Sequence, residues 1–268
     1  VLVLYIDYKI NVSVMKDEIL GAVGRYAFQA EPFHCDNSYH LFLPHLCNQL
    51  LNAADLHSNE RGYGVRVLND LHKTWVLSRF NLEISHLPEV YEGFAIETWV
   101  DNVMRYFTSR NFRVIDINGN VCANAHSIWA LIDTDTRQPV DILKINNGRI
   151  MNYVDRDKHI PIAPGGRLKF TTKGERLKSV VMNYSDIDMN GHVNSMKYME
   201  HMLNLWPISW HNKHRVKRFE IAYVAESYEG DELNLYVGHE DELIDDIKIT
   251  KLKSNYEQEV VRGRICFD

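Results

Sequence analysis

The feature that most constrains this chain is an internal repeat. Tyr91-Glu92-Gly93 recurs as Tyr228-Glu229-Gly230, at an offset of 137 residues (228 minus 91). The residues after each copy correspond in their apolar alternation and in the place of the next turn: Phe94 to Val100 with Asp231 to Val237, and Asn118 to Asn120 with Asn255 to Glu257. Self-similarity at one fixed offset is typical of repeated structural units. The sequence therefore predicts two copies of one domain.

Each copy is expected to begin with a helix and to continue as strands, an expectation that is compared with the structure below. Apolar side chains at helical spacing predict the two helices: Leu46, Leu50, Leu51 and Ala54 in the first copy, and Met199, Met202, Leu203 and Trp206 in the second. Pro207 is expected to end the second helix, because proline lacks the amide hydrogen. Strand-like patterns follow over 76–84, 110–116, 121–133 and 219–225. A helix lying on a strongly curved antiparallel sheet would bury both apolar faces, which places the chain in the α+β class.

The boundary between the copies is predicted near residue 150. Residues 138–176 show weak periodicity and contain several linker-type residues: Pro139, Pro161, Pro164, Gly165 and Gly166. We expect an N-terminal extension over 1–24, a first domain over 25–150, and a linker with a second domain over 151–268. A strand-like pattern returns over 177–182. Because Met15 would serve as a translation start, residues 1–14 are interpreted as an upstream extension.

Composition argues against several classes of protein. The 268 residues are 45% hydrophobic and 25% charged, the balance of a water-soluble globular chain, and the net charge of −6 gives no basic field for nucleic acid or an anionic membrane. The apolar run over 1–6 is too short to span a bilayer and lacks the preceding positive residues of a secretion signal. The four cysteines lack C-x-x-C spacing, which argues against a zinc ribbon or a redox dithiol and fits the reducing cytoplasm: Cys35, Cys47, Cys122 and Cys266.

The densest polar segment runs from Tyr184 to Asn194, directly before the second predicted helix. Within it, Asp188, Asn190 and His192 supply a carboxylate, an amide and an imidazole. A helix N-terminus presents free backbone N–H groups and a partial positive charge, which would stabilise a carbonyl oxygen that becomes negative during attack. Gly191 would let a ligand approach the backbone closely. The segment is therefore a candidate catalytic site.

A purely structural interpretation competes with this one. Asp188 and Asn194 could be ordinary turn and N-cap residues, and His192 a satisfied structural histidine. For Asn194 alone we prefer the N-cap. For the whole segment the structural interpretation weakens, because a cap needs one polar side chain and five lie between Asp186 and Asn194.

At this segment the chain resembles the acyl-acyl-carrier-protein thioesterases of plant plastids and bacteria. Their pattern of Asp-x-Asn-x-His-Val-Asn followed by a tyrosine stands here as Asp188, Asn190, His192, Val193, Asn194 and Tyr198. Thr74 to Arg79 and Glu97 to Val100 resemble two strands of that family, and the resemblance extends over most of residues 25–267. It implies a tandem (double) hot-dog fold and hydrolysis of acyl-acyl carrier protein, which releases free fatty acid and ends fatty acid chain elongation.

The second catalytic segment of that family aligns with Tyr223 to Ser227. Its glutamate is kept as Glu226, whereas Ser227 stands where the family usually has cysteine, which favours a carboxylate mechanism over a thiol nucleophile. The resemblance implies that Glu226 or Asp188 activates water and that His192 transfers protons. It implies further that Asn190 and the backbone from Gly191 to Val193 place the carbonyl. The choice between the two carboxylates stays open.

The resemblance also implies a role for the first domain. That domain would be non-catalytic and would shape the acyl pocket, with Trp75 and Trp99 among the lining residues and the helix around 50–57 beside them. Gly191, Val193 and Asn194 complete the predicted substrate-binding set. For any one apolar residue, plain core packing is an equally good interpretation.

A short basic run suggests how an acidic carrier protein would dock: Lys213, Arg215, Lys217 and Arg218. Most such runs are solvated loops, which is the competing interpretation. His211 and His214 lack a third ligand, so we expect no metal, and no organic cofactor is expected either. The sequence leaves a homodimer open.

Three alternative functions remain at this point. Acyl-CoA could replace acyl carrier protein as the donor. A double hot-dog hydratase or dehydratase would share the fold, but those enzymes space aspartate and histidine further apart than Asp188 and His192. A non-catalytic acyl-thioester sensor would have lost the acid–base set, which is intact here.

Overall fold

The computed structural model describes residues 20–163, 165, 168–170 and 174–268. Most of the predicted N-terminal extension, including Met15, lies outside the described residues, as do Pro164 and Gly166 of the predicted linker. The first described strand begins at Gly24, one residue before the start predicted for the first domain.

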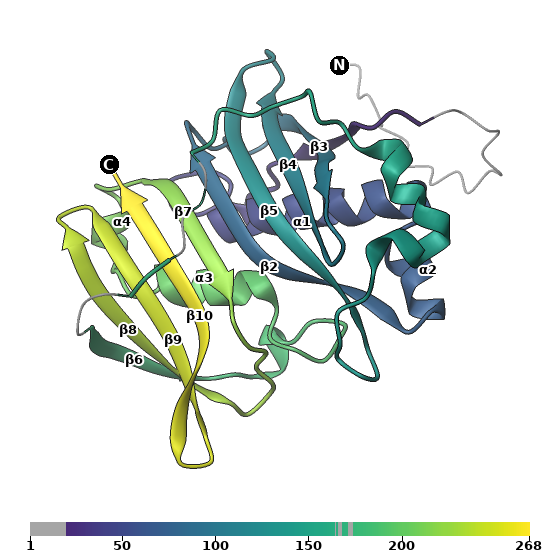
Figure 1. Ribbon diagram of the computed structural model, residues 1–268. Helices are drawn as coiled ribbons and strands as arrows, with labels where there is room; N and C mark the ends of the chain where they lie inside the picture. The colour runs from purple at the N-terminus through teal and green to yellow at the C-terminus, as the bar shows by residue number, and fades with distance from the viewer. Residues whose placement is uncertain (1–19, 164, 166–167, 171–173) are drawn as a thin grey trace.

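Two successive sets of elements build the molecule (Figure 1). The first set is β1 (Gly24–Gln29), α1 (Leu43–Glu60), α2 (Val65–Asp70), β2 (Lys73–Ile84), β3 (Gly93–Val103), β4 (Phe107–Asp116) and β5 (Val121–Asp133). The second set is β6 (Glu175–Val181), α3 (Ser195–Leu203), α4 (Ile208–His211), β7 (Val216–Tyr223), β8 (Glu232–Asp241), β9 (Ile244–Lys253) and β10 (Tyr256–Phe267). Three short 3₁₀ segments complete the list: η1 (Pro32–His34), η2 (Ile142–Tyr153) and η3 (Tyr184–Asp186).

The strands form one antiparallel sheet in the order β1-β3-β4-β5-β2-β7-β10-β9-β8-β6. Read outward from the central β2–β7 pair, both halves have the same order, because β2, β5, β4, β3 and β1 correspond to β7, β10, β9, β8 and β6. The duplicated tripeptide precedes β3 in one half and β8 in the other. The structure therefore confirms the predicted repeat.

The two longer α-helices, α1 and α3, lie together on one face of this sheet (Figure 1). Helix α1 buries Leu46, Leu50 and Ala54, as its spacing predicts, and α3 buries Met199, Met202 and Leu203. These side chains share a single core cluster with the inward-facing strand residues of both halves. Joining β2 to β7 thus gives the two predicted domains one continuous core.

Four local predictions need correction. Each half begins with a strand rather than a helix, because β1 precedes α1 and β6 precedes α3. Helix α3 ends at Leu203, so Trp206 lies in the following turn and Pro207 caps the short α4 rather than ending α3. Strand β7 ends at Tyr223, before Ala225. The predicted linker contains η2, in which Ile145 to Gly148 depart from helical angles.

No helix among the described residues is long and apolar enough to cross a membrane.

Candidate active site

All four predicted catalytic residues line one cavity of about 640 Å³ between the two halves of the molecule. Asp188, Asn190 and His192 come from the loop before α3, and Glu226 comes from the loop after β7. The first half supplies the opposite wall through residues of α1, β2 and β5, among them Leu51, Trp75 and Trp129. We call this space the catalytic cavity. Residues more than thirty positions apart in the sequence therefore meet at one site.

The loop from Asp188 to His192 is a tight turn held by the aspartate itself. Asp188 Oδ1 accepts hydrogen bonds from the N–H groups of Asn190 at 2.8 Å and His192 at 3.3 Å. The Asp188 carbonyl oxygen accepts the N–H of Gly191 at 3.0 Å, and Gly191 has a φ of +79°, which glycine adopts without strain. The Asp188 carboxylate therefore fixes the turn that presents Asn190 and His192.

The predicted backbone donors for a developing oxyanion are not free. The N–H of Gly191 bonds to Asp188, that of His192 to the Asp188 carboxylate, and that of Val193 to the Ser227 carbonyl oxygen at 2.8 Å. The prediction that these amides place the carbonyl is therefore wrong, because the turn uses all three. Asn190 keeps its side-chain amide on the cavity wall with no hydrogen bond to any described residue.

The predicted substrate-binding residues of this loop separate in the structure. Val193 and Asn194 line the catalytic cavity, whereas Gly191 does not. Asn194 is also the N-cap of α3, because its Oδ1 accepts the N–H of Met196 at 2.8 Å. The structural interpretation preferred for Asn194 is confirmed.

Glu226 lies at the centre of a charged cluster. Its Oε2 is 3.4 Å from Nε2 of His192, and its Oε1 pairs with the guanidinium of Arg137. Arg137 belongs to the loop after β5 in the first half and also lines the catalytic cavity. The guanidinium holds the Glu226 carboxyl group in place beside His192. This arrangement permits a proton to pass between the carboxylate and the imidazole.

Two further residues hold this cluster. The Tyr228 hydroxyl donates to Glu226 Oε2 at 3.3 Å, and the tyrosine ring contacts the His192 ring with centroids 5.2 Å apart. Nearly buried Lys251 donates from Nζ to the Glu226 carbonyl oxygen at 2.8 Å and to Asp231 at 2.7 Å. The loop that carries Glu226 is thus fixed from both sides.

Sequence reasoning did not find Arg137 or Tyr228 as site residues. Tyr228 was visible only as part of the repeated tripeptide. Arg137 has no motif around it, and only folding brings it from the other half of the chain.

Ser227 is fully buried and does not line the catalytic cavity. Its carbonyl oxygen accepts the N–H of Val193, which ties the two catalytic loops together. A hydroxyl held away from the cavity has no path to a substrate carbonyl. Its placement agrees with the interpretation that a side-chain nucleophile is missing at this position.

The two tryptophans predicted to line the acyl pocket lie on opposite faces of the sheet. Trp75 lines the catalytic cavity. Trp99 is fully buried elsewhere, where its Nε1 donates to the Lys158 carbonyl oxygen at 3.0 Å and the Lys158 ammonium lies 4.6 Å from its ring centroid. Because strand neighbours alternate, Val100 faces the helices and Trp99 faces the 158–163 segment. The prediction for Trp99 is therefore wrong.

The basic run is not near the catalytic cavity. Lys213, Arg215, Lys217 and Arg218 lie before or at the start of β7, whereas Tyr223 at its end lines the cavity. Six residues of strand separate Lys217 from Tyr223 by about 20 Å. Lys217 pairs with Asp268 at 3.0 Å, and Arg218 pairs with Glu220 at 2.7 Å. The prediction of a basic patch beside the site is therefore wrong.

Among the residues that the structure describes, no group of three or more histidine, cysteine, aspartate or glutamate side chains is arranged to hold a metal ion. Glu226, His192, Asp188 and Asn190 are polar groups that the two loops of the second half present to the cavity. A carboxylate paired with an imidazole and facing an amide donor suits proton transfer during hydrolysis of an acyl compound.

Comparison with known proteins supplies independent findings. Residues 22–145 match the model of the acyl-ACP thioesterase N-terminal domain, and residues 171–267 match that of the C-terminal domain. The crystal structure of an acyl-ACP thioesterase from Bacteroides thetaiotaomicron is 42% identical, with a TM-score of 0.84, covering 92% of this chain and 98% of that one.

More distant relatives agree in fold. The 12:0-ACP thioesterase from Umbellularia californica has a TM-score of 0.80 at 19% identity, covering 94% of this chain and 99% of that one. The chloroplastic oleoyl-acyl carrier protein thioesterase 2 of Arabidopsis thaliana is 27% identical over 204 residues, covering 69% of this chain and 52% of that protein. The chain spans about half the length of the curated relatives it matches. The predicted α+β double hot-dog architecture is confirmed.

Proposed function

The chain belongs to the acyl-ACP thioesterase family, and we propose that it hydrolyses the thioester of a fatty acyl group carried by acyl carrier protein, releasing the free fatty acid. The observation that carries this proposal is the His192–Glu226 contact of 3.4 Å inside a cavity lined by both halves of the molecule. A fatty acyl thioester needs such a cavity for its chain and such a pair for its reaction.

Glu226 is our choice for the base that activates water. It contacts His192 and Arg137, whereas Oδ1 of Asp188 already accepts two backbone N–H groups and shapes the turn. Glu226 takes a proton from a water molecule while the water oxygen bonds to the thioester carbon. The Asn190 side-chain amide donates to the carbonyl oxygen as negative charge develops on it.

The second half of the reaction breaks the carbon–sulfur bond. The tetrahedral intermediate collapses and the sulfur leaves with the bonding electron pair. The proton taken by Glu226 passes through His192 to the thiolate, so the products are a carboxylic acid and the thiol of the carrier. Water supplies both the oxygen and the proton, and the protein side chains return to their starting state.

The test is a panel of acyl-acyl carrier protein and acyl-CoA thioesters of graded chain length, scored for free fatty acid. Glu226→Gln should lower kcat by at least about 100-fold, the usual contribution of a general base. Ser227→Ala should keep most of the activity, because the Ser227 side chain is buried outside the cavity.

Each result separates this proposal from its alternatives. If free acid is released from acyl-CoA but not from acyl-acyl carrier protein, then CoA rather than the carrier protein is the donor. Release of 3-hydroxyacyl product from an enoyl thioester would indicate a hydratase. An inactive Ser227→Ala with an active Glu226→Gln would overturn the mechanism.

A further inference from the structure

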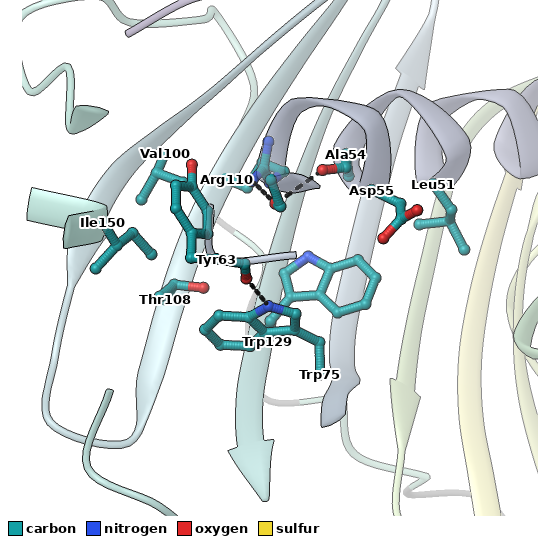
Figure 2. Close-up of a pocket in the computed structure, with 11 residues that line it drawn as sticks. Leu51, Ala54, Asp55, Tyr63, Trp75, Val100, Thr108, Arg110, Trp129 and Ile150 are labelled. Atoms are coloured by element: carbon teal, nitrogen blue, oxygen red, sulfur yellow. Dashed lines mark hydrogen bonds between the residues drawn. The ribbon is translucent and has the colours of Figure 1, made fainter. Parts of the chain in front are cut away.

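A second cavity lies in the first half of the molecule and shares part of its lining with the catalytic cavity (Figure 2). Leu51, Trp75 and Trp129 line both spaces and form the wall between them. The second space, which we call the inner cavity, has a volume of about 70 Å³. Since one water needs roughly 10–15 Å³, the inner cavity has room for the last few atoms of an acyl chain.

The inner cavity is not lined only by apolar groups. Val100 and Ile150 contribute apolar surface, but the polar residues Arg110 and Thr108 also line this space (Figure 2). Ser58 lines it as well. Arg110 is only 4% exposed. Burying a charged group in such a place has a desolvation cost that an apolar side chain would avoid. A pocket for a plain hydrocarbon end has no need of it.

The hydroxyl groups around Arg110 are oriented to hold a cation. The Ser58 hydroxyl donates to the Ala54 carbonyl oxygen and accepts from Arg110 Nη2 at 2.9 Å. The Thr98 hydroxyl donates to the Asn111 carbonyl oxygen and accepts from Arg110 Nη1 at 3.1 Å. Because each hydroxyl proton is already committed to the backbone, its oxygen lone pairs point at the guanidinium.

No carboxylate of the described residues forms an ion pair with Arg110. A guanidinium carries five N–H donors, and those of Arg110 bond to the uncharged hydroxyl oxygens of Ser58 and Thr98. The uncharged Tyr63 hydroxyl also interacts with this guanidinium. Asp55 also lines the inner cavity, but its carboxylate accepts from Asn59 Nδ2 at 2.8 Å instead. The cavity therefore contains one cation and one carboxylate without a direct bond between them, and an uncharged polar group would fit between these charges without adding a third.

We infer that the inner cavity receives the distal end of the acyl chain and that Arg110 selects chains carrying an uncharged oxygen there, as a hydroxyl or carbonyl group. This inference rests on the proposed function, because the thioester must lie in the catalytic cavity for the chain end to reach Arg110. Leu51, Trp75 and Trp129 would then border the chain between the two cavities.

The experiment compares hydrolysis of acyl-acyl carrier protein thioesters in three series of graded length, with a methyl, a hydroxyl or a carboxylate at the distal end. At one length, the distal hydroxyl should raise kcat/KM about 10-fold over the matched methyl chain, the effect expected of a hydrogen bond to a charged group. Arg110→Met should remove this preference, measured as the ratio of kcat/KM for the hydroxyl chain to kcat/KM for the methyl chain of the same length.

Arg61→Met is the matched control. Arg61 is also buried in the first half, at 2% exposure, but it bonds to the Gly21 carbonyl oxygen and does not line the inner cavity. This variant should keep the preference for the distal hydroxyl. If Arg61→Met also loses the preference, the loss comes from general destabilisation of the first half, and a specific role of Arg110 is contradicted.

The wild-type comparison does not depend on whether a variant folds. Hydrolysis of all three series with no preference for the distal hydroxyl would overturn the inference and leave the proposed function standing. A preference for the carboxylate over the hydroxyl would overturn the assignment of an uncharged group. Failure to hydrolyse any thioester would instead reject the proposed function.

Discussion

At the scale of single residues, the site depends on which side chains remain free after the loops have formed. Asp188 lines the cavity, yet its Oδ1 accepts two backbone N–H groups. Glu226 contacts His192 and Arg137 directly. The sequence motif places both carboxylates in one candidate site, but their hydrogen-bond partners distinguish Asp188, which forms the turn, from Glu226, the proposed base.

Arg137 gives a prediction at this scale. Arg137→Met should lower kcat about 10-fold and leave KM nearly unchanged, because the guanidinium positions and stabilises Glu226 without being needed to hold the acyl chain. Arg137→Lys should restore part of the loss. Steady-state kinetics on one acyl-acyl carrier protein substrate measures both parameters.

Arg105→Met is the control for that prediction, because Arg105 forms a comparable exposed ion pair with Asp141 at 3.3 Å in the first half but does not line the cavity. Its kcat should stay at the wild-type value. Both variants should change the free energy of unfolding by less than about 1 kcal/mol, since exposed ion pairs stabilise little. An Arg137→Met variant with full kcat would remove Arg137 from the site.

At the scale of elements, strand alternation and strand length correct two predictions. Alternation in β3 directs Trp99 to the face opposite the helices, although Trp75 in β2 reaches the cavity. The extended length of β7 keeps the basic run about 20 Å from the end that carries the site. Trp99 was assigned to the pocket from its residue type, and the basic run was assigned to the site from its nearness to Glu226 in the sequence. Neither property determines a position in space.

The end of α1 is attached to the segment before β1 by a buried histidine. His57 Nε2–H donates to the Ala22 carbonyl oxygen at 2.9 Å, and Nδ1 accepts from the Tyr63 hydroxyl at 3.2 Å. Burial, aided by the charges of Arg110 and Arg61, lowers the pKa of His57 to about 2. The imidazole is therefore neutral in the folded protein near neutral pH.

This lowered pKa predicts an acid-sensitive stability. The unfolded chain binds a proton at His57 below about pH 6.5, whereas the folded chain does so only near pH 2. Stability from the neutral imidazole is thus fully present above pH 6.5 and decreases as the pH falls, by up to about 1.4 kcal/mol per pH unit. Denaturant unfolding measured from pH 7 to pH 4.5 should show this slope.

His57→Gln should have a flatter pH dependence than the wild type over the same range, although it is less stable at pH 7. His72→Gln is the control, because the His72 side chain is 70% exposed. That variant should reproduce the wild-type slope. Equal slopes in all three proteins would show that His57 titrates normally in the folded state.

At the scale of the whole molecule, the two halves share one sheet and one core. β2 pairs with β7 from Arg79↔Ala222 to Glu83↔Arg218, and a single buried cluster contains side chains from both sets of elements. The catalytic cavity has walls from both halves. Neither half by itself therefore contains all the residues of the site. Each half alone would also leave the hydrogen-bonding edge of β2 or β7 unpaired.

This arrangement predicts one cooperative unfolding transition. Phe219 is fully buried beside the junction. Phe219→Ala should lower the free energy of unfolding by about 3–5 kcal/mol, and the unfolding transition should stay single. Far-ultraviolet circular dichroism and tryptophan fluorescence should give the same midpoint, which falls in the variant. Separate midpoints for the two signals would contradict the shared core.

The sequence by itself determined the duplicated architecture, the strands that follow the main helix of each copy, and the segments that carry Asp188, His192 and Glu226. These features follow from periodicity, from the fixed offset and from a local motif, all of which act along the chain. Only the tertiary structure decided the partners of Glu226, the face of Trp99 and the inner cavity around Arg110. Those depend on which distant side chains meet when the sheet closes at β2 and β7, and no pattern along the chain encodes such a meeting.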